Sequence, residues 1–242
     1  MKTYGLIGRQ LTHSFSPHYF YSYFAKNGLN DYQYNLYPLQ DIEEIKGLWS
    51  SIPNLVGLNV TIPYKLQIID YLYDISQTAK DIGAVNVIKK TSKGWYGHNT
   101  DGPAFLETLK SFLGTNLIIR AIVLGSGGSS KAVTWALKQL DIEYLIVSRS
   151  GTLNYNNFDI EYLNSHRLII NTTPLGMYPN VEECPEIPYF LLNNKFYLYD
   201  LIYNPEKTLF LNYGYKQGTQ TKNGMDMLHR QAELSWEFWT HK

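Results

Sequence analysis

The 242-residue sequence has little of several features that would define a class of protein. It contains one cysteine, Cys184, so neither an intramolecular disulfide nor a cysteine metal cluster can form. Lysine and arginine together number 21, aspartate and glutamate also number 21, and no long basic run occurs. This balance argues against nucleic acid or an anionic membrane as the main partner. The six histidines have no ligand-like spacing, so no metal site is expected.

Long apolar runs are also missing, and none approaches the length needed to span a bilayer. The first residues, Met1 to Gly5, lead directly into an apolar strand without a signal-peptide pattern. A reducing, cytoplasmic setting is therefore expected. The hydrophobic fraction of 44% is ample for a buried core, and the length fits one large domain or two modest ones.

The sequence does contain a regular alternation of strand and helix patterns. In the first part, strands are predicted at 4–8, 32–37, 55–61, 83–88 and 95–97, and helices from Ser16 and at 41–49 and 101–113. Ser16 is the expected N-cap, with Pro17 in the first helical position. In the second part, strands are predicted at 117–124, 143–147, 167–170 and 196–202, and helices at 130–140, 205–217 and 224–240. This alternation predicts an α/β fold with a parallel, doubly wound sheet.

A glycine- and serine-rich turn, Gly125 to Ser130, lies between a predicted buried strand and a helix. This is the context of a dinucleotide fingerprint, in which the first glycine allows the tight turn and the second lets the backbone approach a pyrophosphate. The N–H groups at the helix start would then bind the phosphates. The alternative is a plain strand-to-helix turn. The predicted cofactor contacts are Gly125, Ser126, Gly127, Gly128 and Ser129.

The next predicted strand ends at Ser148, Arg149 and Ser150. An enzyme that uses NAD would place Asp or Glu here for the ribose 2′-hydroxyl, and this sequence has none. Arginine between two hydroxyls suits a 2′-phosphate, which favours NADP. The alternative is a solvated arginine at a strand end.

The segment from Gly57 to Lys65 (GLNVTIPYK) alternates polar and apolar side chains. Asn59 and Thr61 would share one face of a strand that Pro63 ends, because proline has no N–H to donate. Lys65 is expected in the first turn of a helix just past the strand. A lysine there can act as a general acid or base if its surroundings lower its pKa, and the alternative is an ordinary surface lysine.

Further polar residues occur at predicted turns or on the last helix: Ser14, Ser16, Asn86, Asp101 and Gln231. Each alone has an ordinary explanation as a cap, a turn or a buried core residue. Together, the blocks of sequence around them resemble the shikimate dehydrogenase family over nearly the whole chain. The matching blocks are 4–8, 13–17 (HSFSP), 57–65, 83–86 (GAVN), 99–102 (NTDG), 171–177 (NTTPLGM), 200–205 (DLIYNP) and 223–231 (NGMDMLHRQ).

The resemblance implies two domains. Residues 1–101, completed by the C-terminal helix at 222–242, would form the substrate-binding domain, and residues 102–221 a Rossmann-like NADP-binding domain. The substrate would lie in the cleft between them. The implied reaction is reversible hydride transfer from NADPH to the ketone of 3-dehydroshikimate, which gives shikimate in the biosynthesis of chorismate and aromatic amino acids.

The resemblance also implies residue roles. Lys65 matches the catalytic lysine and Asp101 the carboxylate that orients it, with both protonation states of Lys65 left open. Ser14, Ser16 and Thr61 match groups that bind the substrate carboxylate, Asn86 and Gln231 groups that bind ring hydroxyls, and Tyr203 a ring or carboxylate contact. Leu201 and Gly224 would lie near the nicotinamide. Asn59 would support its strand.

Three alternatives stay open. The family usually has Asn-Arg-Thr or Asn-Arg-Ser where this chain has Ser148 to Ser150, and no second basic residue follows in 151–160. An NAD-using quinate/shikimate dehydrogenase is therefore the nearest rival, followed by a non-catalytic shikimate- or nucleotide-binding regulator and by a dehydrogenase acting on a folate. The segment 149–171 is shorter than usual in the family, which predicts that one helix of the nucleotide domain is reduced or lost. A monomer or a homodimer with small-molecule partners is expected.

Overall fold

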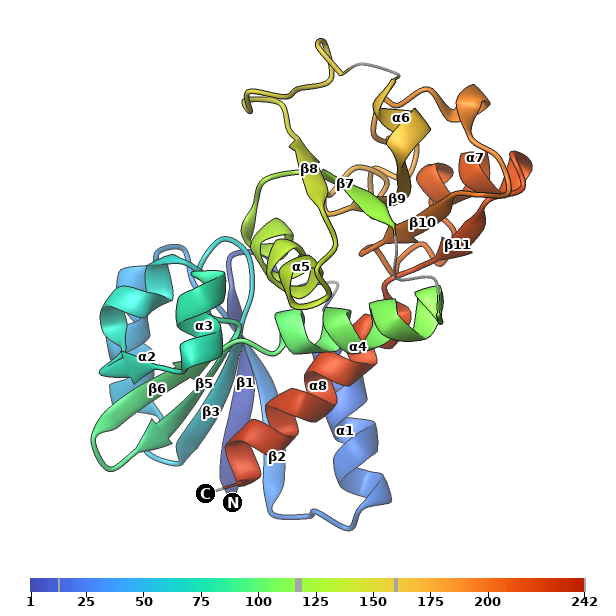
Figure 1. Cartoon of the computed structure of the whole chain (residues 1–242). Helices are drawn as coiled ribbons and strands as arrows, with labels where there is room; N and C mark the ends of the chain where they lie inside the picture. The colour runs from blue at the N-terminus through green and yellow to red at the C-terminus, as the bar shows by residue number, and fades with distance from the viewer. Residues whose placement is uncertain (13, 116–118, 159–160, 242) are drawn as a thin grey trace. The chain divides into compact units, whose positions relative to one another are not determined.

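The computed structural model describes residues 1–12, 14–115, 119–158 and 161–241 (Figure 1). The chain divides into two compact units, of which the first is Met1–Thr100 with Gln231–Lys242 and the second is Asp101–Arg230. The C-terminal segment of the first unit thus begins at residue 231, whereas the family resemblance implied a start at residue 222. His13 of the predicted N-terminal block and the first two residues of the strand predicted at 117–124 lie outside the described residues.

The first unit is built on one mixed sheet. Its strands are β1 (Lys2–Gly8), β2 (Tyr32–Pro38), β3 (Leu55–Val60), β4 (Asp74–Ile75), β5 (Val87–Thr91) and β6 (Gly94–His98). They lie in the order β2-β1-β3-β5-β6-β4, with β1 parallel to β2 and β3, and β5 antiparallel to β3 and β6. The helices are α1 (Ser16–Lys26), α2 (Ile45–Ser51), α3 (Gln77–Ile82), the 3-10 helices η1 (Ile42–Glu44) and η2 (Gln67–Tyr71), and the part of α8 (Met225–Thr240) from Gln231 onward.

Both faces of this sheet are covered because side chains alternate along its strands. Ile7 of β1 packs in a core with the residues of η1, α2 and η2. Its neighbour Leu6 faces a second core, rich in aromatic rings, to which α1 contributes Phe20 and α8 contributes Trp236 and Trp239. The C-terminal helix therefore belongs to the hydrophobic core of the first unit.

The second unit contains a fully parallel sheet. Its strands are β7 (Arg120–Leu124), β8 (Tyr144–Val147), β9 (His166–Asn171), β10 (Tyr197–Asp200) and β11 (Gln220–Lys222), in the order β11-β10-β9-β7-β8. Its helices are α4 (Asp101–Leu113), α5 (Gly128–Gln139), α6 (Tyr162–Ser165), α7 (Leu209–Lys216) and the 3-10 helix η3 (Tyr189–Leu191). Residues 121–124 of β7, an interior strand of this sheet, are fully buried. The predicted α/β class is confirmed, and the short α6 agrees with the reduced helix predicted between 149 and 171.

Several predicted boundaries were wrong. Ser16 is the first residue of α1, and Phe15 takes the N-cap position without a side-chain cap bond. Lys65 lies in a turn before the 3-10 helix η2, not in an α-helix. The helix predicted from Pro205 begins at 209, because the side chain of Thr208 accepts a hydrogen bond from the N–H of Leu211 and so caps α7. The short elements β4, α3 and β11 were not predicted.

A buried carboxylate ties together the carboxyl ends of two neighbouring strands in the second unit. Asp200, at the end of β10, accepts hydrogen bonds from Asn171 Nδ2 (3.0 Å), Thr208 Oγ1 (2.6 Å) and the N–H of Ile202 (3.1 Å). Burial raises the pKa of the Asp200 carboxyl to about 6, and the three hydrogen bonds act in the opposite direction. The loops that follow β9 and β10 are therefore attached to one side chain.

No helix in the described part of the chain is long and apolar enough to cross a membrane. Among the same residues, no group of three or more His, Cys, Asp or Glu side chains is arranged to hold a metal ion.

The raised pKa of Asp200 predicts a pH dependence of stability. The carboxyl binds its proton more tightly in the folded state (pKa about 6) than in the unfolded state (3.8), so its contribution is fully present below pH 3.8 and is lost as the pH rises through 6. Across this window the wild type should lose about 3 kcal/mol of unfolding free energy relative to Asp200→Asn. Urea denaturation of both proteins from pH 4 to 7 measures this difference, and parallel pH curves would contradict it.

Close packing at Gly57 of β3 predicts a second effect on stability. A Cβ atom on Gly57 would lie 2.5 Å from the indole Nε1 of Trp239, which donates a hydrogen bond to the carbonyl of Ile88 (3.0 Å). Gly57→Ala should therefore lower the free energy of unfolding by about 1–3 kcal/mol. Gly47→Ala in α2 is the matched control, because nothing lies within 4 Å of its added Cβ and the change should be neutral or stabilising. Equal stability of the two variants would refute the packing argument.

Candidate active site

The turn that carries Lys65 is held rigidly between two other segments of the first unit. The N–H of Thr61 donates to the carbonyl of Ile7 in β1 (2.9 Å), and the carbonyl of Lys65 accepts from the N–H of Val85 (2.8 Å). Between them the buried Tyr64 donates its hydroxyl hydrogen to the carbonyl of Leu39 (2.7 Å). Lys65 is half-buried on this turn. A general acid on a fixed backbone can meet its substrate in a constant geometry.

Asn86 lies beside this turn in the fold. Its carbonyl accepts from the N–H of Val60 (2.8 Å), the residue before Thr61. Its side chain is buried and bonded twice to Thr100, because Oδ1 accepts from the Thr100 N–H (2.7 Å) and Nδ2 donates to Thr100 Oγ1 (2.9 Å). Main-chain hydrogen bonds therefore bring Thr61, Lys65 and Asn86 together at the carboxyl end of β3.

The predicted carboxylate-binding serines lie in and just after the loop that follows β1. The N–H of Arg9 donates to the carbonyl of Ile62 (3.3 Å), so this loop begins next to the turn that carries Lys65. Ser14 is half-buried, and its N–H donates to the carbonyl of Leu11 (3.0 Å). Ser16 is half-buried at the start of α1, near the hydroxyl of Tyr34 on β2.

Gln231, on α8, is the first residue of the C-terminal segment of the first unit. Its carbonyl accepts a hydrogen bond from Ser235 Oγ (2.7 Å), which in turn contacts Asn59 Nδ2 (3.0 Å) and Thr100 Oγ1 (3.2 Å). The helical turn that carries Gln231 is thus bonded to the same polar group as Asn86. Asn59 is buried inside this group, consistent with the supporting role expected from the sequence.

Asp101 is the first residue of α4 and of the second unit, and it directly follows Thr100 in the chain. Its side chain is 8% exposed. A carboxylate in the first turn of a helix is stabilised by the helix dipole.

The glycine loop after β7 has the geometry of a phosphate cradle. Gly125 has a φ of +109°, and a Cβ atom there would lie 2.7 Å from Thr172 Oγ1, so only glycine fits. Gly127 occupies the N-cap position of α5 in an extended conformation with no side-chain cap. The first N–H groups of α5 are therefore not bonded by an N-cap side chain, which is the arrangement that binds phosphate.

Ser148, Arg149 and Ser150 follow β8, the strand next to β7. The N–H of Gly125 donates to the carbonyl of Val147 (2.8 Å), which places this segment beside the glycine loop. Ser148 is buried, whereas Arg149 and Ser150 are exposed. An exposed guanidinium here fits the 2′-phosphate of NADP, and none of the three residues is acidic.

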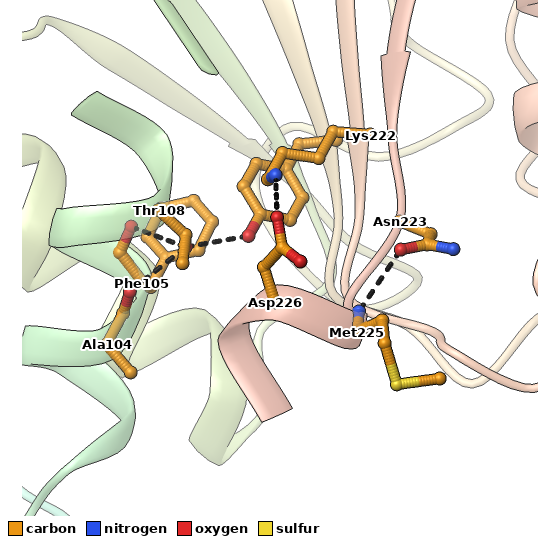
Figure 2. Close-up of polar contacts among 8 residues, drawn as sticks. Ala104, Phe105, Thr108, Lys222, Asn223, Met225 and Asp226 are labelled. Carbon is orange, nitrogen blue, oxygen red and sulfur yellow. Dashed lines mark hydrogen bonds and ion pairs between the residues drawn. The ribbon is translucent and has the colours of Figure 1, made fainter. Parts of the chain in front are cut away.

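Gly224 allows the closest main-chain contact in this part of the second unit. Its N–H donates to the carbonyl of Ile202 (3.0 Å), and a Cβ atom on Gly224 would lie 2.0 Å from the carbonyl oxygen of Leu201. Figure 2 shows the start of α8 around it, where Asn223 Oδ1 accepts from the N–H of Met225 (3.2 Å) and Lys222 pairs with Asp226. Leu201, Gly224 and the half-buried Tyr203 are thus neighbours.

Sequence reasoning assigned no role to Tyr34, Thr100, Asp200 or Ser235. Asp200 had one detectable signal, since Asn171 directly follows one predicted strand and Asp200 interrupts the apolar pattern of another; the structure pairs the two residues in register. Tyr34 and Ser235 had none, because each lies in an ordinary amphipathic pattern.

Comparison with known proteins confirms the resemblance found in the sequence. The family model described as the shikimate dehydrogenase substrate binding domain matches residues 6–88. A protein of Methanococcus maripaludis strain C7, named shikimate dehydrogenase (NADP(+)), is 36% identical over 259 residues, which cover 99% of this chain and 91% of that protein.

Solved structures agree. A crystal structure of a shikimate dehydrogenase in complex with NADP+ has a TM-score of 0.89 and 31% identity, and the match covers 100% of this chain and 91% of that one. Shikimate 5-dehydrogenase from Thermus thermophilus, in complex with NADP(H) and shikimate, has a TM-score of 0.87 and 29% identity over 100% and 94% of the two chains. The chain belongs to the shikimate dehydrogenase family.

Proposed function

We propose that this chain catalyses the reversible, NADP-dependent reduction of 3-dehydroshikimate to shikimate. The observation that carries the proposal is the grouping of Thr61, Lys65 and Asn86 at the end of β3 by main-chain hydrogen bonds. The glycine loop of the second unit supplies a cradle that fits the dinucleotide phosphates. The first unit is assigned to the substrate and the second to the cofactor, and the reaction serves aromatic biosynthesis in the cytoplasm.

The acid–base chemistry belongs to Lys65. When bound, the nicotinamide supplies the hydride that converts the ketone carbon to an alcohol carbon. The ketone oxygen then gains negative charge, and the Lys65 ammonium donates a proton to it, which balances the step as ketone plus hydride plus proton. In the reverse direction the neutral amine removes that proton. Asp101 is assigned to the same substrate hydroxyl and to the orientation of Lys65.

The remaining residues bind and orient the ligands. Ser14, Ser16 and Thr61 are assigned to the substrate carboxylate, Asn86 and Gln231 to ring hydroxyls, and Tyr203 to the ring or carboxylate. The main-chain N–H groups of the glycine loop and of the start of α5 are assigned to the pyrophosphate, Ser148 to Ser150 to the 2′-phosphate, and Leu201 and Gly224 to the nicotinamide. All these residues lie in one chain, so a monomer or a homodimer satisfies the proposal.

The direct test is the absorbance of reduced nicotinamide with purified protein, shikimate, and either NADP or NAD. Reduction of NADP in preference to NAD is expected. Equal use of NAD, or faster turnover of quinate, would replace the proposal by the NAD-using quinate/shikimate dehydrogenase. Shikimate binding without turnover would point to the regulator.

Replacing the proposed general acid should affect the chemical step. Lys65→Ala is expected to lower kcat by about 10²–10⁴-fold while the KM for shikimate changes much less. Lys90→Ala, which removes an exposed lysine on β5, is the matched control and should keep the wild-type kcat. Steady-state kinetics in the direction of shikimate oxidation measures both. If Lys65→Ala retained most of its kcat, the acid–base assignment would be wrong.

Removing the proposed 2′-phosphate contact should affect one cofactor only. Arg149→Ala is expected to raise the KM for NADP about tenfold or more and to leave the KM for NAD nearly unchanged, because NAD has no 2′-phosphate. Arg120→Ala removes the same charge at the opposite end of the sheet, where Arg120 pairs with Glu143, and should change neither value. A similar rise in KM for both cofactors would contradict the assignment.

A further inference from the structure

A continuous series of hydrogen bonds runs through the interior of the first unit and reaches Gln231 and Asn86, which the proposed function assigns to the substrate. We call it the buried relay. Its members come from β2, β3, α8 and the segments around residues 86 and 100. They are Tyr34, Asn59, Ser235, Thr100 and Asn86.

The first half of the buried relay connects β2 to α8. Tyr34 donates its hydroxyl hydrogen to Asn59 Oδ1 (2.8 Å), and burial raises the pKa of Tyr34, so this hydroxyl stays protonated. Because Oδ1 of Asn59 accepts this bond, the amide nitrogen Nδ2 is the donor of the Asn59 side chain. Nδ2 donates to Ser235 Oγ (3.0 Å).

The second half has one consistent assignment of donors. Ser235 Oγ has a single proton, which it donates to the carbonyl of Gln231 (2.7 Å). It must then accept from Thr100 Oγ1 (3.2 Å), whose own proton is thereby used. Thr100 Oγ1 accepts in turn from Asn86 Nδ2 (2.9 Å), while the Thr100 N–H donates to Asn86 Oδ1 (2.7 Å). Thr100 Oγ1 also lies 3.3 Å from Asn86 Oδ1. A hydrogen bond there would need the hydroxyl proton that Thr100 already donates to Ser235.

The buried relay has little access to solvent. Tyr34 and Ser235 are 0% exposed, Thr100 is 1% exposed and Asn59 is 6% exposed. Water cannot readily replace a lost partner at these positions, so removing one hydroxyl leaves its neighbours unsatisfied or makes them reorient. Reorientation of Thr100 would act directly on the amide of Asn86, and loss of Ser235 Oγ would release the carbonyl of Gln231.

We propose that Tyr34, Asn59, Thr100 and Ser235 are positioning residues that hold the Asn86 amide and the Gln231 turn of α8 in the orientation that binds shikimate. This inference rests on the proposed function for its consequence in catalysis, whereas the orientation of Asn86 is a property of the free protein. The two parts are tested separately.

The kinetic test removes single hydroxyl groups. Ser235→Ala and Thr100→Val should each raise the KM for shikimate about 5- to 30-fold and leave the KM for NADP within about twofold. Thr100→Ser keeps Oγ and should restore a KM near that of the wild type. Thr108→Val is the matched control, because the buried Thr108 Oγ1 bonds a buried tyrosine hydroxyl, that of Tyr199 (2.8 Å), in the second unit (Figure 2).

A purely structural network predicts a different result. In that case Ser235→Ala and Thr100→Val would lower Tm as much as Thr108→Val does and leave the KM for shikimate unchanged, which would overturn the proposal.

A mutant cycle adds a second criterion. If Ser235 acts through the Asn86 amide and the Gln231 turn, Ser235→Ala should raise the KM much less in an Asn86→Ala background than in the wild type. An equal fold-rise of the KM for shikimate in both backgrounds would contradict the proposal.

Hydrogen exchange tests the buried relay without substrate. The Thr100 amide donates to Asn86 Oδ1, so its protection should fall in Ser235→Ala and stay at the wild-type level in Thr108→Val. Unchanged protection in Ser235→Ala would overturn the proposal. If protection falls but the wild-type protein does not oxidise shikimate, the buried relay stands and the proposed function fails.

Discussion

Buried hydrogen bonds between α8 and the sheet of the first unit are the constraint on which the arrangement of the proposed substrate residues depends. Ser235 Oγ is bonded to Asn59 of β3 and to Thr100, and the indole N–H of Trp239 donates to the carbonyl of Ile88 in β5. In a buried setting each of these groups would lose free energy if it were left without a partner. The helix therefore has one favourable register against the strands.

The C-terminal end of α8 is held by a different kind of contact. Lys89 Nζ donates to the carbonyls of Phe238 (3.0 Å) and His241 (3.1 Å), where the helix leaves carbonyl groups unbonded and the dipole favours a positive charge. The ammonium also lies 4.6 Å from the centre of the Phe238 ring. Burial of the imidazole ring, together with the positive charge of Lys89, lowers the pKa of His98, which stacks on Phe238, to about 4. His98 is therefore neutral near pH 7 and adds no second charge beside Lys89.

The second unit uses a related principle at the carboxyl ends of its strands. Asp200 attaches the loops after β9 and β10, and the contact between Gly125 and Thr172 joins the glycine loop to the same edge of the sheet. A parallel sheet brings the ends of all its strands to one edge, so a few polar residues there can fix several loops. The predicted cofactor residues lie at this edge, in the segments that follow β7, β8, β10 and β11.

The sequence predicted most of the larger elements because their signals are local. The interior strand β7 is an apolar run, and α4 has both a start at Asp101 and a stop at Gly114 that agree with the structure. Local rules were less successful where distant residues decide the conformation. Ser16 has the composition of an N-cap, yet α1 starts one residue earlier than expected and Phe15 takes the N-cap position. β4 and β11 have only two and three residues, too few to show a period.

The same distinction applies to the site. The sequence by itself determined which polar residues follow which strands, and with them the family, the glycine loop and the identity of Lys65, because these are encoded in short contiguous blocks. Only the tertiary structure decided which of the polar groups bond one another. Asn59 and Ser235 are 176 residues apart in the chain and 3.0 Å apart in the fold. Whether a hydroxyl or an amide group forms hydrogen bonds within the protein depends on the direction of its donors and on its burial. Both are set by partners that no local pattern identifies.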